Sequence, residues 1–185
     1  MAPLEPSAVA RLRSERGFTL VDMLFVVGLI GLLSTLAVPG LTRAKGAAQA
    51  SSALASLKVI NSAELSYAIS CGLGFYSPNL TTLGVPPPGS SAAYLPIELS
   101  SAATVNKGGY QFQLTGTALA GAPVSCNGLG AGLGSPGYKV GASPLEAPNT
   151  RYFATNSGGL LYEAQSSLFA AIPESGPSGV GTLVQ

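Results

Sequence analysis

The longest apolar stretch of the sequence runs from Met23 to Leu41 and contains no charged residue. A helix of about 20 residues, rising 1.5 Å per residue, covers the roughly 30 Å of a bilayer core. Asp22 stands directly before this stretch and is the only aspartate of the chain. The pattern therefore predicts a membrane-spanning helix over 23–41, with one carboxylate at its start.

Beyond Pro39 the pattern becomes amphipathic but keeps a helical period. One face is predicted to carry the apolar residues Leu54, Leu57, Leu65 and Ala68. Polar residues fall largely elsewhere, at Ser51, Ser52, Lys58, Ser62 and Ser66. We expect one helix from Phe18 to about Ile69, which the glycines at 72 and 74 end. Its second half would support a head.

A connecting region is expected between Cys71 and Lys107, before the first strong strand pattern. Within it, Ser77-Pro78 is followed by two leucines and then by Gly84. This arrangement is typical of a single helical turn, with Ser77 as its N-cap and Gly84 as its end.

Four short runs then predict β-strands. In the clearest, Tyr110–Thr115, apolar and polar residues alternate as in a half-buried strand. The others are 137–142, 150–155 and 159–164, and Asn156-Ser157-Gly158-Gly159 predicts a hairpin turn between the last two. The expected fold class is α+β, a long N-terminal helix packed on a small antiparallel sheet of about four strands. We expect the Gly-rich link 116–134 and the tail 173–185 to be irregular.

Length and composition fit one small head on a helical stalk. Once a leader and a long apolar helix are set aside, the 185 residues leave enough chain for one small domain. Charged residues make up 9% of the chain, against about 25% in a typical globular domain. Such a neutral, Gly- and Pro-rich chain favours an exported protein over a cytosolic enzyme.

The charge before the apolar stretch predicts its orientation in a membrane. Arg11, Arg13 and Arg16 precede it, and basic flanks stay on the cytoplasmic side. The chain is therefore expected to cross the membrane once, with a cytoplasmic N-terminus. A competing interpretation is an ordinary signal peptide, cut after Ala37 so that Val38 becomes the first residue.

The sequence gives little support to catalytic chemistry. Histidine is absent, and histidine is the usual general base at neutral pH and the commonest metal ligand. The sequence contains no nucleophile elbow, P-loop or dinucleotide-binding fingerprint. After Gly17, six Lys and Arg balance six Asp and Glu, which leaves no basic footprint for nucleic acid. We expect no enzymatic activity, cofactor, metal site or clear nucleic-acid binding.

Cys71 and Cys126 are the only cysteines. In an exported head, an even count suggests one disulfide. It would tie the end of the helix to the loop after the Tyr110–Thr115 strand. Two free buried thiols, or a redox or metal role, are the alternatives.

Residues 17–22, Gly-Phe-Thr-Leu-Val-Asp, followed by the long apolar helix, resemble the N-terminus of type IV pilins and the related pseudopilins. In that family a prepilin peptidase cuts after the glycine on the cytoplasmic side and methylates the new N-terminal residue. The resemblance implies cleavage between Gly17 and Phe18 and N-methylation of Phe18. It also implies a pilin-like fold with a leader at 1–17, a long helix at 18–70 and a globular head at 71–185.

The resemblance also gives Asp22 a role in assembly. A carboxylate is favoured near a helix N-terminus, and in hydrocarbon it needs a cationic partner. In the family the equivalent residue is usually Glu, which pairs with the N-terminal amine of a neighbouring subunit. Here the pair would join Asp22 to the amine of Phe18, with a side chain one methylene shorter. An interfacial carboxylate without a partner is the alternative.

Small residues along the apolar helix allow close helix contact, at Gly28, Gly31, Ser34 and Thr35. Gly31 and Pro39 also weaken the helix, since proline removes a hydrogen-bond donor and clashes with the preceding turn. In assembled pili of this family, a stretch between such residues loses helicity. Simple tolerance of glycine and proline in a membrane helix is the other interpretation.

The favoured function is a structural subunit of a type IV pilus or pilus-like filament. Its expected partners are other pilin subunits, the prepilin peptidase, an inner-membrane assembly platform and the membrane itself. The precursor would lie in the inner membrane, and the filament would be extracellular or periplasmic. A minor pilin or type II secretion pseudopilin is an alternative. Major pseudopilins usually carry a calcium loop, whereas the acidic residues near this C-terminus, Glu146, Glu163 and Glu174, are scattered.

A second class of function is a secreted binding module released by ordinary signal peptidase. It would bind through the Gly-rich loops or through exposed aromatic residues, with Tyr94, Tyr110 and Tyr138 as the candidates.

Overall fold

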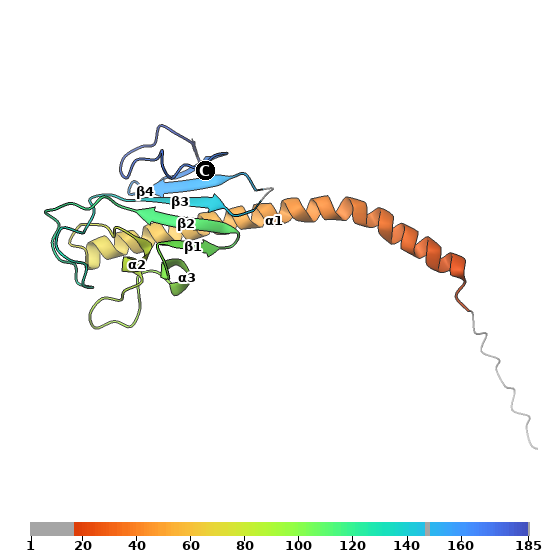
Figure 1. Cartoon of the computed structure of the whole chain (residues 1–185), viewed down its shortest axis with the longest axis horizontal. Helices are drawn as coiled ribbons and strands as arrows, with labels where there is room; N and C mark the ends of the chain where they lie inside the picture. Colours follow the sequence, from red (N-terminus) through yellow and green to blue (C-terminus); the bar gives the residue numbers. More distant parts are fainter. Residues whose placement is uncertain (1–16, 147–148, 185) are drawn as a thin grey trace, which may run out of the picture. The chain divides into compact units, whose positions relative to one another are not determined.

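The structure, a computed structural model, describes residues 17–146 and 149–184. They belong to two compact units, one ending at Thr42 and the other beginning at Arg43. Helix α1 (Leu20–Ser70) belongs to both, and the remainder of the second unit is the head (Figure 1). The predicted long N-terminal helix is confirmed.

The described residues of the head form two one-turn helices and six strands. Their bounds are α2 (Leu80–Leu83), α3 (Ile97–Ser100), β1 (Thr104–Lys107), β2 (Tyr110–Thr115), β3 (Lys139–Pro144), β4 (Tyr152–Asn156), β5 (Leu161–Ala164) and β6 (Thr182–Leu183). The strands lie in chain order in one sheet, and every neighbouring pair is antiparallel. The predicted antiparallel sheet is confirmed, but the expected number of about four strands is wrong.

The two unpredicted strands, β1 and β6, are the edges of the sheet. β1 lies in the expected connecting region, and β6 lies in the tail that we expected to be irregular. They are four and two residues long. Val105 is the only apolar residue of β1, so this strand has no alternating pattern. Pairing with the neighbouring strand, rather than local hydrophobicity, makes these segments extended.

Glycine-containing turns set two of the hairpins. Gly108 and Gly109 join β1 to β2 with φ values of 58° and 82°, a left-handed conformation that favours glycine. A Cβ at Gly109 would also collide with the side chain of Gln49 on α1. Between β4 and β5, the amide of Gly159 donates to the carbonyl of Asn156 at 2.8 Å, which confirms the predicted turn.

The core of the head forms along one narrow face of α1. Six residues of this face and the residue directly after the helix, none more than 2% exposed, follow one another at alternating spacings of three and four: Ala50, Ala53, Leu57, Ile60, Glu64, Tyr67 and Cys71. We call this row the α1 seam. Such spacing keeps side chains on a single line along a helix. The seam packs against buried side chains of the sheet, including Phe112, Val140 and Phe153.

The expected apolar face was partly wrong. Leu57 and Ala68 are buried and Leu54 is half-buried, but Leu65 is 54% exposed. Leu65 follows the seam residue Glu64, and one residue turns a helix by about 100°. The buried position in this turn is therefore occupied by an acid, and the leucine beside it faces solvent.

The other face of the sheet has a smaller apolar cluster. Phe153 faces the α1 seam, and the next residue, Ala154, faces the opposite way, as alternation along a strand requires. Ala154 and Tyr162 pack there with Leu168 and Ile172 of the C-terminal segment. The chain after β5 therefore covers this part of the sheet.

The N-cap of α2 is Asn79, so the expectation of Ser77 was wrong. The side chain of Asn79 accepts the amide of Thr82 at 3.0 Å. The Ser77 hydroxyl instead exchanges hydrogen bonds with the backbone of Asn79, forming a small turn before the helix. Gly84 follows the last helical residue, as expected.

The α1 seam predicts opposite outcomes for two leucines of the same helix. Leu57→Ala should lower the free energy of unfolding by about 2–5 kcal/mol, because it removes a fully buried side chain. Leu65→Ala should change it by less than about 0.5 kcal/mol. Denaturant unfolding of the full chain in detergent, followed by tyrosine fluorescence, measures both. Equal losses for the two variants would contradict this assignment of the seam.

Candidate functional site

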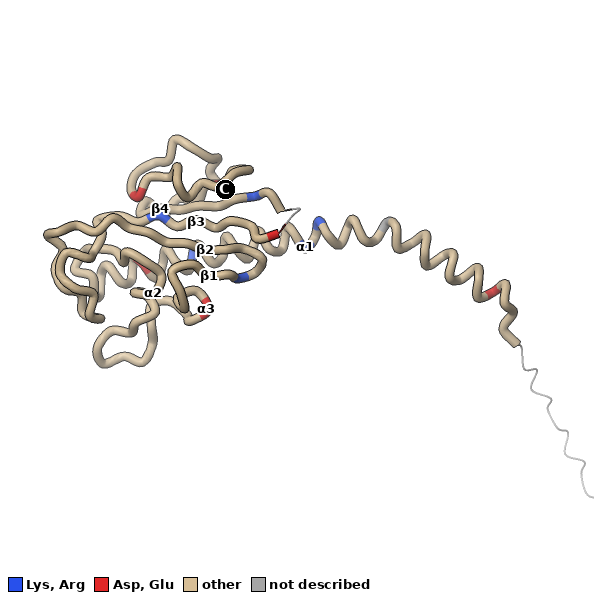
Figure 2. The backbone as a smooth tube through the Cα atoms, in the orientation of Figure 1, with Lys and Arg blue, Asp and Glu red and all other residues tan. Residues whose placement is uncertain are grey.

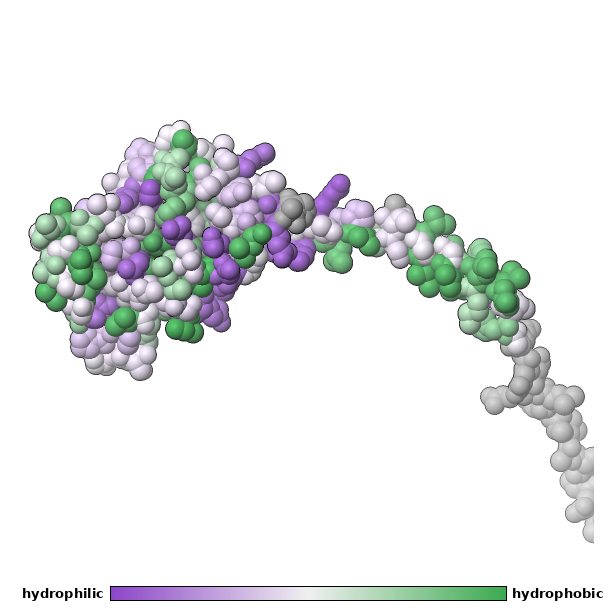
Figure 3. All heavy atoms as spheres, viewed as in Figure 1, coloured by the Kyte–Doolittle hydropathy of each residue, from purple (hydrophilic) through white to green (hydrophobic). Residues whose placement is uncertain are grey.

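The first half of α1 has no core of its own. Every described side chain from Gly17 to Lys45 is exposed, and Leu36 is not among the described side chains. Apolar residues cover this half of the helix in Figure 3. Phe18 and Leu20 at its start are 75% and 80% exposed. By length and composition, α1 is apolar enough to cross a membrane.

Asp22 and Thr19 form a reciprocal pair at the first turn of α1. The hydroxyl and the amide of Thr19 both donate to Asp22 Oδ2, at 2.7 and 3.2 Å. In return, the amide of Asp22 donates to Thr19 Oγ1 at 3.2 Å. This is a capping box, in which two helix-terminal amides are satisfied by side chains. Asp22 therefore has a partner within its own chain.

Asp22 keeps capacity for a second partner. Among the described residues, no hydrogen bond reaches its Oδ1, and no cation forms an ion pair with it. Charged positions are sparse along this part of the helix (Figure 2). The nitrogen of Phe18 is still a peptide amide in the uncut chain, so the proposed cationic partner exists only after cleavage. Sequence reasoning missed Thr19, although a Thr followed three residues later by an acid is a capping signal.

The Gly17–Phe18 bond lies just before the helix. Both residues are exposed and have no regular secondary structure. A Cβ added to Gly17 would meet no atom within 4 Å. Within the part of the chain that the structure describes, packing therefore does not require glycine at this position. The rest of the expected leader, residues 1–16, lies outside the described residues.

The helix is continuous through Gly31 and Pro39, the expected weak points. Hydroxyls in this stretch bond within the helix: Ser34 donates to the carbonyl of Ile30, and Thr35 donates to that of Leu32, both at 2.8 Å. Such bonding removes the cost of placing these hydroxyls in hydrocarbon. The single chain is thus helical here, and loss of helicity on assembly stays a prediction.

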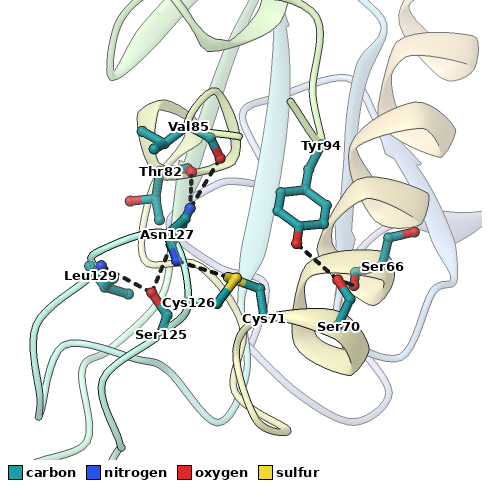
Figure 4. Close-up of a disulfide and its surroundings, with 10 residues drawn as sticks. All are labelled: Ser66, Ser70, Cys71, Thr82, Val85, Tyr94, Ser125, Cys126, Asn127 and Leu129. Atoms are coloured by element: carbon teal, nitrogen blue, oxygen red, sulfur yellow. Dashed lines mark hydrogen bonds between the residues drawn. A yellow bond between two sulfur atoms is a disulfide. The ribbon is translucent and has the colours of Figure 1, made fainter. Parts of the chain in front are cut away.

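The predicted disulfide between Cys71 and Cys126 is confirmed (Figure 4). Cys71 is the last residue of the α1 seam, and its carbonyl accepts the amide of Cys126 at 3.1 Å. The next residue, Asn127, donates its side-chain amide to the carbonyls of Thr82 and Val85 at 2.9 and 3.2 Å. The end of α1, the 125–127 segment and the α2 region are therefore joined at one place.

Two of the three candidate binding tyrosines are not exposed. Tyr110 and Tyr138 are 0% and 3% exposed. The hydroxyl of Tyr110 donates to the carbonyl of Arg151, and that of Tyr138 donates to Asn61 Oδ1. Tyr94 is half-buried, and its hydroxyl lies 2.9 Å from Ser70 Oγ (Figure 4). The expectation of three exposed aromatic residues was wrong, because Tyr110 and Tyr138 are buried in the core of the head and Tyr94 is half-buried.

A groove formed by described residues of the head lies beside α1. It has a volume of about 510 Å³ and is lined by Lys58, Asn61, Leu65, Tyr76, Tyr138 and the turn after β4. Most of its polar groups are engaged within the chain. Asn61, for example, donates to Thr155 Oγ1 at 2.9 Å and accepts from Tyr138. The ammonium of Lys58 is the exposed charge of the groove.

The acidic residues near the C-terminus do not converge. Glu163 forms a bidentate ion pair with Arg151, which lowers the pKa of Glu163. Glu174 accepts the hydroxyl and the amide of Thr117. Within the described residues, no three His, Cys, Asp or Glu side chains lie close enough together to hold a metal ion.

Comparison of the chain with protein-family models, with curated proteins and with solved structures gave no match.

The disulfide should stabilise the head. Its cysteines are 55 residues apart, and closing a loop of that size is worth about 4 kcal/mol by chain entropy. Reduction should therefore lower the thermal midpoint of the full chain in detergent. Peptide mass analysis without reductant should find the Cys71–Cys126 link. The double variant Cys71→Ala, Cys126→Ala is the control, since reductant should not change its midpoint. Two alkylatable thiols in oxidised native protein would contradict the assignment.

Proposed function

We propose that this protein is a structural subunit of a type IV pilus or pilus-like filament, polymerised through its N-terminal helix. The observation that carries the proposal is an exposed apolar helix with a single carboxylate in its first turn. That carboxylate follows a Gly17–Phe18 junction that resembles a prepilin cleavage site. A soluble monomer would not keep such a surface in water, because exposed apolar area is unfavourable.

Cleavage would create the assembly contact. Removal of residues 1–17 turns the nitrogen of Phe18 into a positively charged amine at the start of the helix. When helices stack side by side, that amine would enter an apolar bundle, where an unpaired charge is costly. The free Oδ1 of Asp22 on a neighbouring subunit would receive it, while Oδ2 keeps its bonds to Thr19.

The rest of the helix would supply packing. Small residues at Gly28 and Gly31 would let neighbouring helices approach closely, and among the described residues no other part of the chain lies within 4 Å of a Cβ added at either site. Before assembly the same surface would hold the subunit in the inner membrane with a cytoplasmic N-terminus. The prepilin peptidase and an inner-membrane assembly platform would then act on it.

A secreted binding module is the second candidate function. The groove beside α1 is the observation that favours it, since it offers an exposed ammonium next to two tyrosines. The two functions differ in the mature N-terminus. Filament assembly requires methylated Phe18, whereas release by signal peptidase would leave Val38. Mass analysis of the mature chain distinguishes them.

Processing should depend on the size of residue 17. Gly17→Leu should leave the precursor uncut, because the peptidase of this family tolerates little beyond a small residue. Gly17→Ala is the matched control and should still be cut, at least in part. Intact mass of the membrane fraction reports both. A Gly17→Leu protein that matures to the wild-type mass would disprove prepilin processing.

Assembly should depend on the charge of Asp22. Asp22→Ala and Asp22→Asn should be inserted and cleaved but should not form filaments, since an unpaired buried amine costs about 3 kcal/mol or more per subunit. Asp22→Glu should assemble, because it keeps the charge and lengthens the reach. Filaments are scored by shearing and electron microscopy, with mature subunit in the membrane as the reference.

The variant Thr19→Val distinguishes the effect of the Asp22 charge on assembly from the effect of the capping box. It removes the hydroxyl that bonds Asp22 but leaves the carboxylate, at a capping cost of about 0.5–2 kcal/mol. It should therefore assemble better than Asp22→Asn. Normal filament yield from both Asp22→Ala and Asp22→Asn would show that the carboxylate is not the assembly contact.

A further inference from the structure

Glu64 is a fully buried acid in the middle of the α1 seam. Its side chain is 0% exposed, three residues before Tyr67 and four after Ile60. Acids are almost never fully buried unless they are paired. Glu64 is outside the proposed assembly contact, so its burial calls for another explanation.

One oxygen of Glu64 holds the chain that follows α1. Oε2 accepts the amide of Ser77, itself 0% exposed, at 2.9 Å. The other oxygen, Oε1, is buried and has no hydrogen-bond partner among the described residues. The neighbouring residue Tyr76 exchanges two backbone hydrogen bonds with Ser135, at 2.8 and 3.0 Å. Glu64 thus holds the segment Phe75–Ser77 against α1. The same segment is hydrogen-bonded to Ser135 through Tyr76.

The titratable groups around Glu64 do not neutralise a negative charge. Tyr67 on α1 and Tyr138 before β3 are within its electrostatic reach, and burial together with the charge of Glu64 raises the pKa of both. Tyr76, on the anchored segment, packs edge-on against Tyr138, and Tyr94 packs edge-on against Tyr67. The phenols of Tyr67 and Tyr138, with their raised pKa values, are neutral at ordinary pH.

The nearest lysine on α1 is directed elsewhere. Lys58 lies six residues before Glu64, which is about 240° around a helix, and its side chain is exposed. Burial, with no cation to offset it among the groups described above, is therefore the larger effect on Glu64. It raises the pKa of Glu64 well above the usual 4.5. The Ser77 hydrogen bond lowers the pKa but has the smaller effect.

We propose that Glu64 is a proton-dependent latch: its neutral carboxylic acid holds Phe75–Ser77 against α1, and loss of the proton favours release of that segment. The neutral acid can leave its buried O–H unpaired at modest cost, whereas a carboxylate there would leave a charge unpaired. Because the disulfide holds Cys71 beside this segment, the release would be local and would leave the sheet folded.

The direction of the pH effect follows from linkage. Glu64 binds its proton more tightly in the closed state than in the open state, where its pKa returns to the usual range. Stabilisation of the closed state is complete below about pH 4.5 and is lost as pH rises to the folded-state pKa. Across that window, the opening constant should rise about tenfold for each pH unit.

Hydrogen exchange of the full-length chain in detergent micelles tests the latch. The amide of Ser77, corrected for intrinsic exchange, should lose about tenfold protection per pH unit within the window. Amides of β2 should show no such loss. In Glu64→Gln, which keeps an acceptor for Ser77 but cannot ionise, the dependence should disappear. Glu98→Gln, which removes an exposed acid paired with Lys107, should retain the wild-type profile.

Two results would overturn the proposal. One is Ser77 protection that does not change with pH in the wild type, and the other is a Glu64→Gln profile that matches the wild type. If Glu64→Gln does not fold, the carboxyl ¹³C resonance of Glu64 in the wild type decides. It should titrate well above pH 4.5, and titration at the usual value would refute the latch.

Discussion

The packing of the α1 seam against the sheet is the interaction on which the head depends. A helix presents a straight row of side chains only when their spacing alternates between three and four, and the seam keeps that spacing from Ala50 to Cys71. Its early positions are alanines, so the β1–β2 hairpin approaches Gln49 closely at Gly109. Its middle positions, Leu57 and Ile60, fill the space under the sheet. Its last position forms the disulfide, which fixes the loop region to the end of the same row.

The elements that sequence reasoning predicted well are those with a local signal. The alternation in Tyr110–Thr115 gives the bounds of β2, and two glycines after Asn156 give the β4–β5 turn. The seam was harder to predict because it contains Ala, Glu, Tyr and Cys, which are small or carry a polar group and so give a weaker apolar signal than leucine or isoleucine. Because Leu65 is apolar, it was assigned to the buried face, but the buried residue of this turn is Glu64. β1 and β6 depend on a neighbouring strand for their hydrogen bonds, so their own residues carry no sufficient signal.

The sequence predicted that Asp22, at the start of α1, needs a partner. It did not identify Thr19 as the partner within the chain. The helix dipole favours a carboxylate at this position, and the hydrophobic context requires that it be neutralised or paired. The structure adds that Thr19 supplies part of that pairing within the chain. A helix capped in this way is already formed before any neighbour arrives. The intermolecular contact that we propose for Asp22 would therefore not have to compensate for ordering the first turn of the helix, and its strength would depend on charge rather than on local folding.

A buried acid in the α1 seam has a desolvation cost, but an apolar residue at the same position would have a cost of its own. A leucine at position 64 would remove the desolvation cost of the carboxyl group, but it would leave the amide of Ser77 buried without an acceptor. An orphaned buried amide costs about 1–3 kcal/mol. A leucine would also let the Phe75–Ser77 segment slide along an apolar surface, because dispersion contacts have no direction. The hydrogen bond from Ser77 selects one register for that segment, and with it the alignment of Tyr76 opposite Ser135. A single polar residue within the apolar row of a coiled coil has this use, since it gives up some stability and specifies one arrangement.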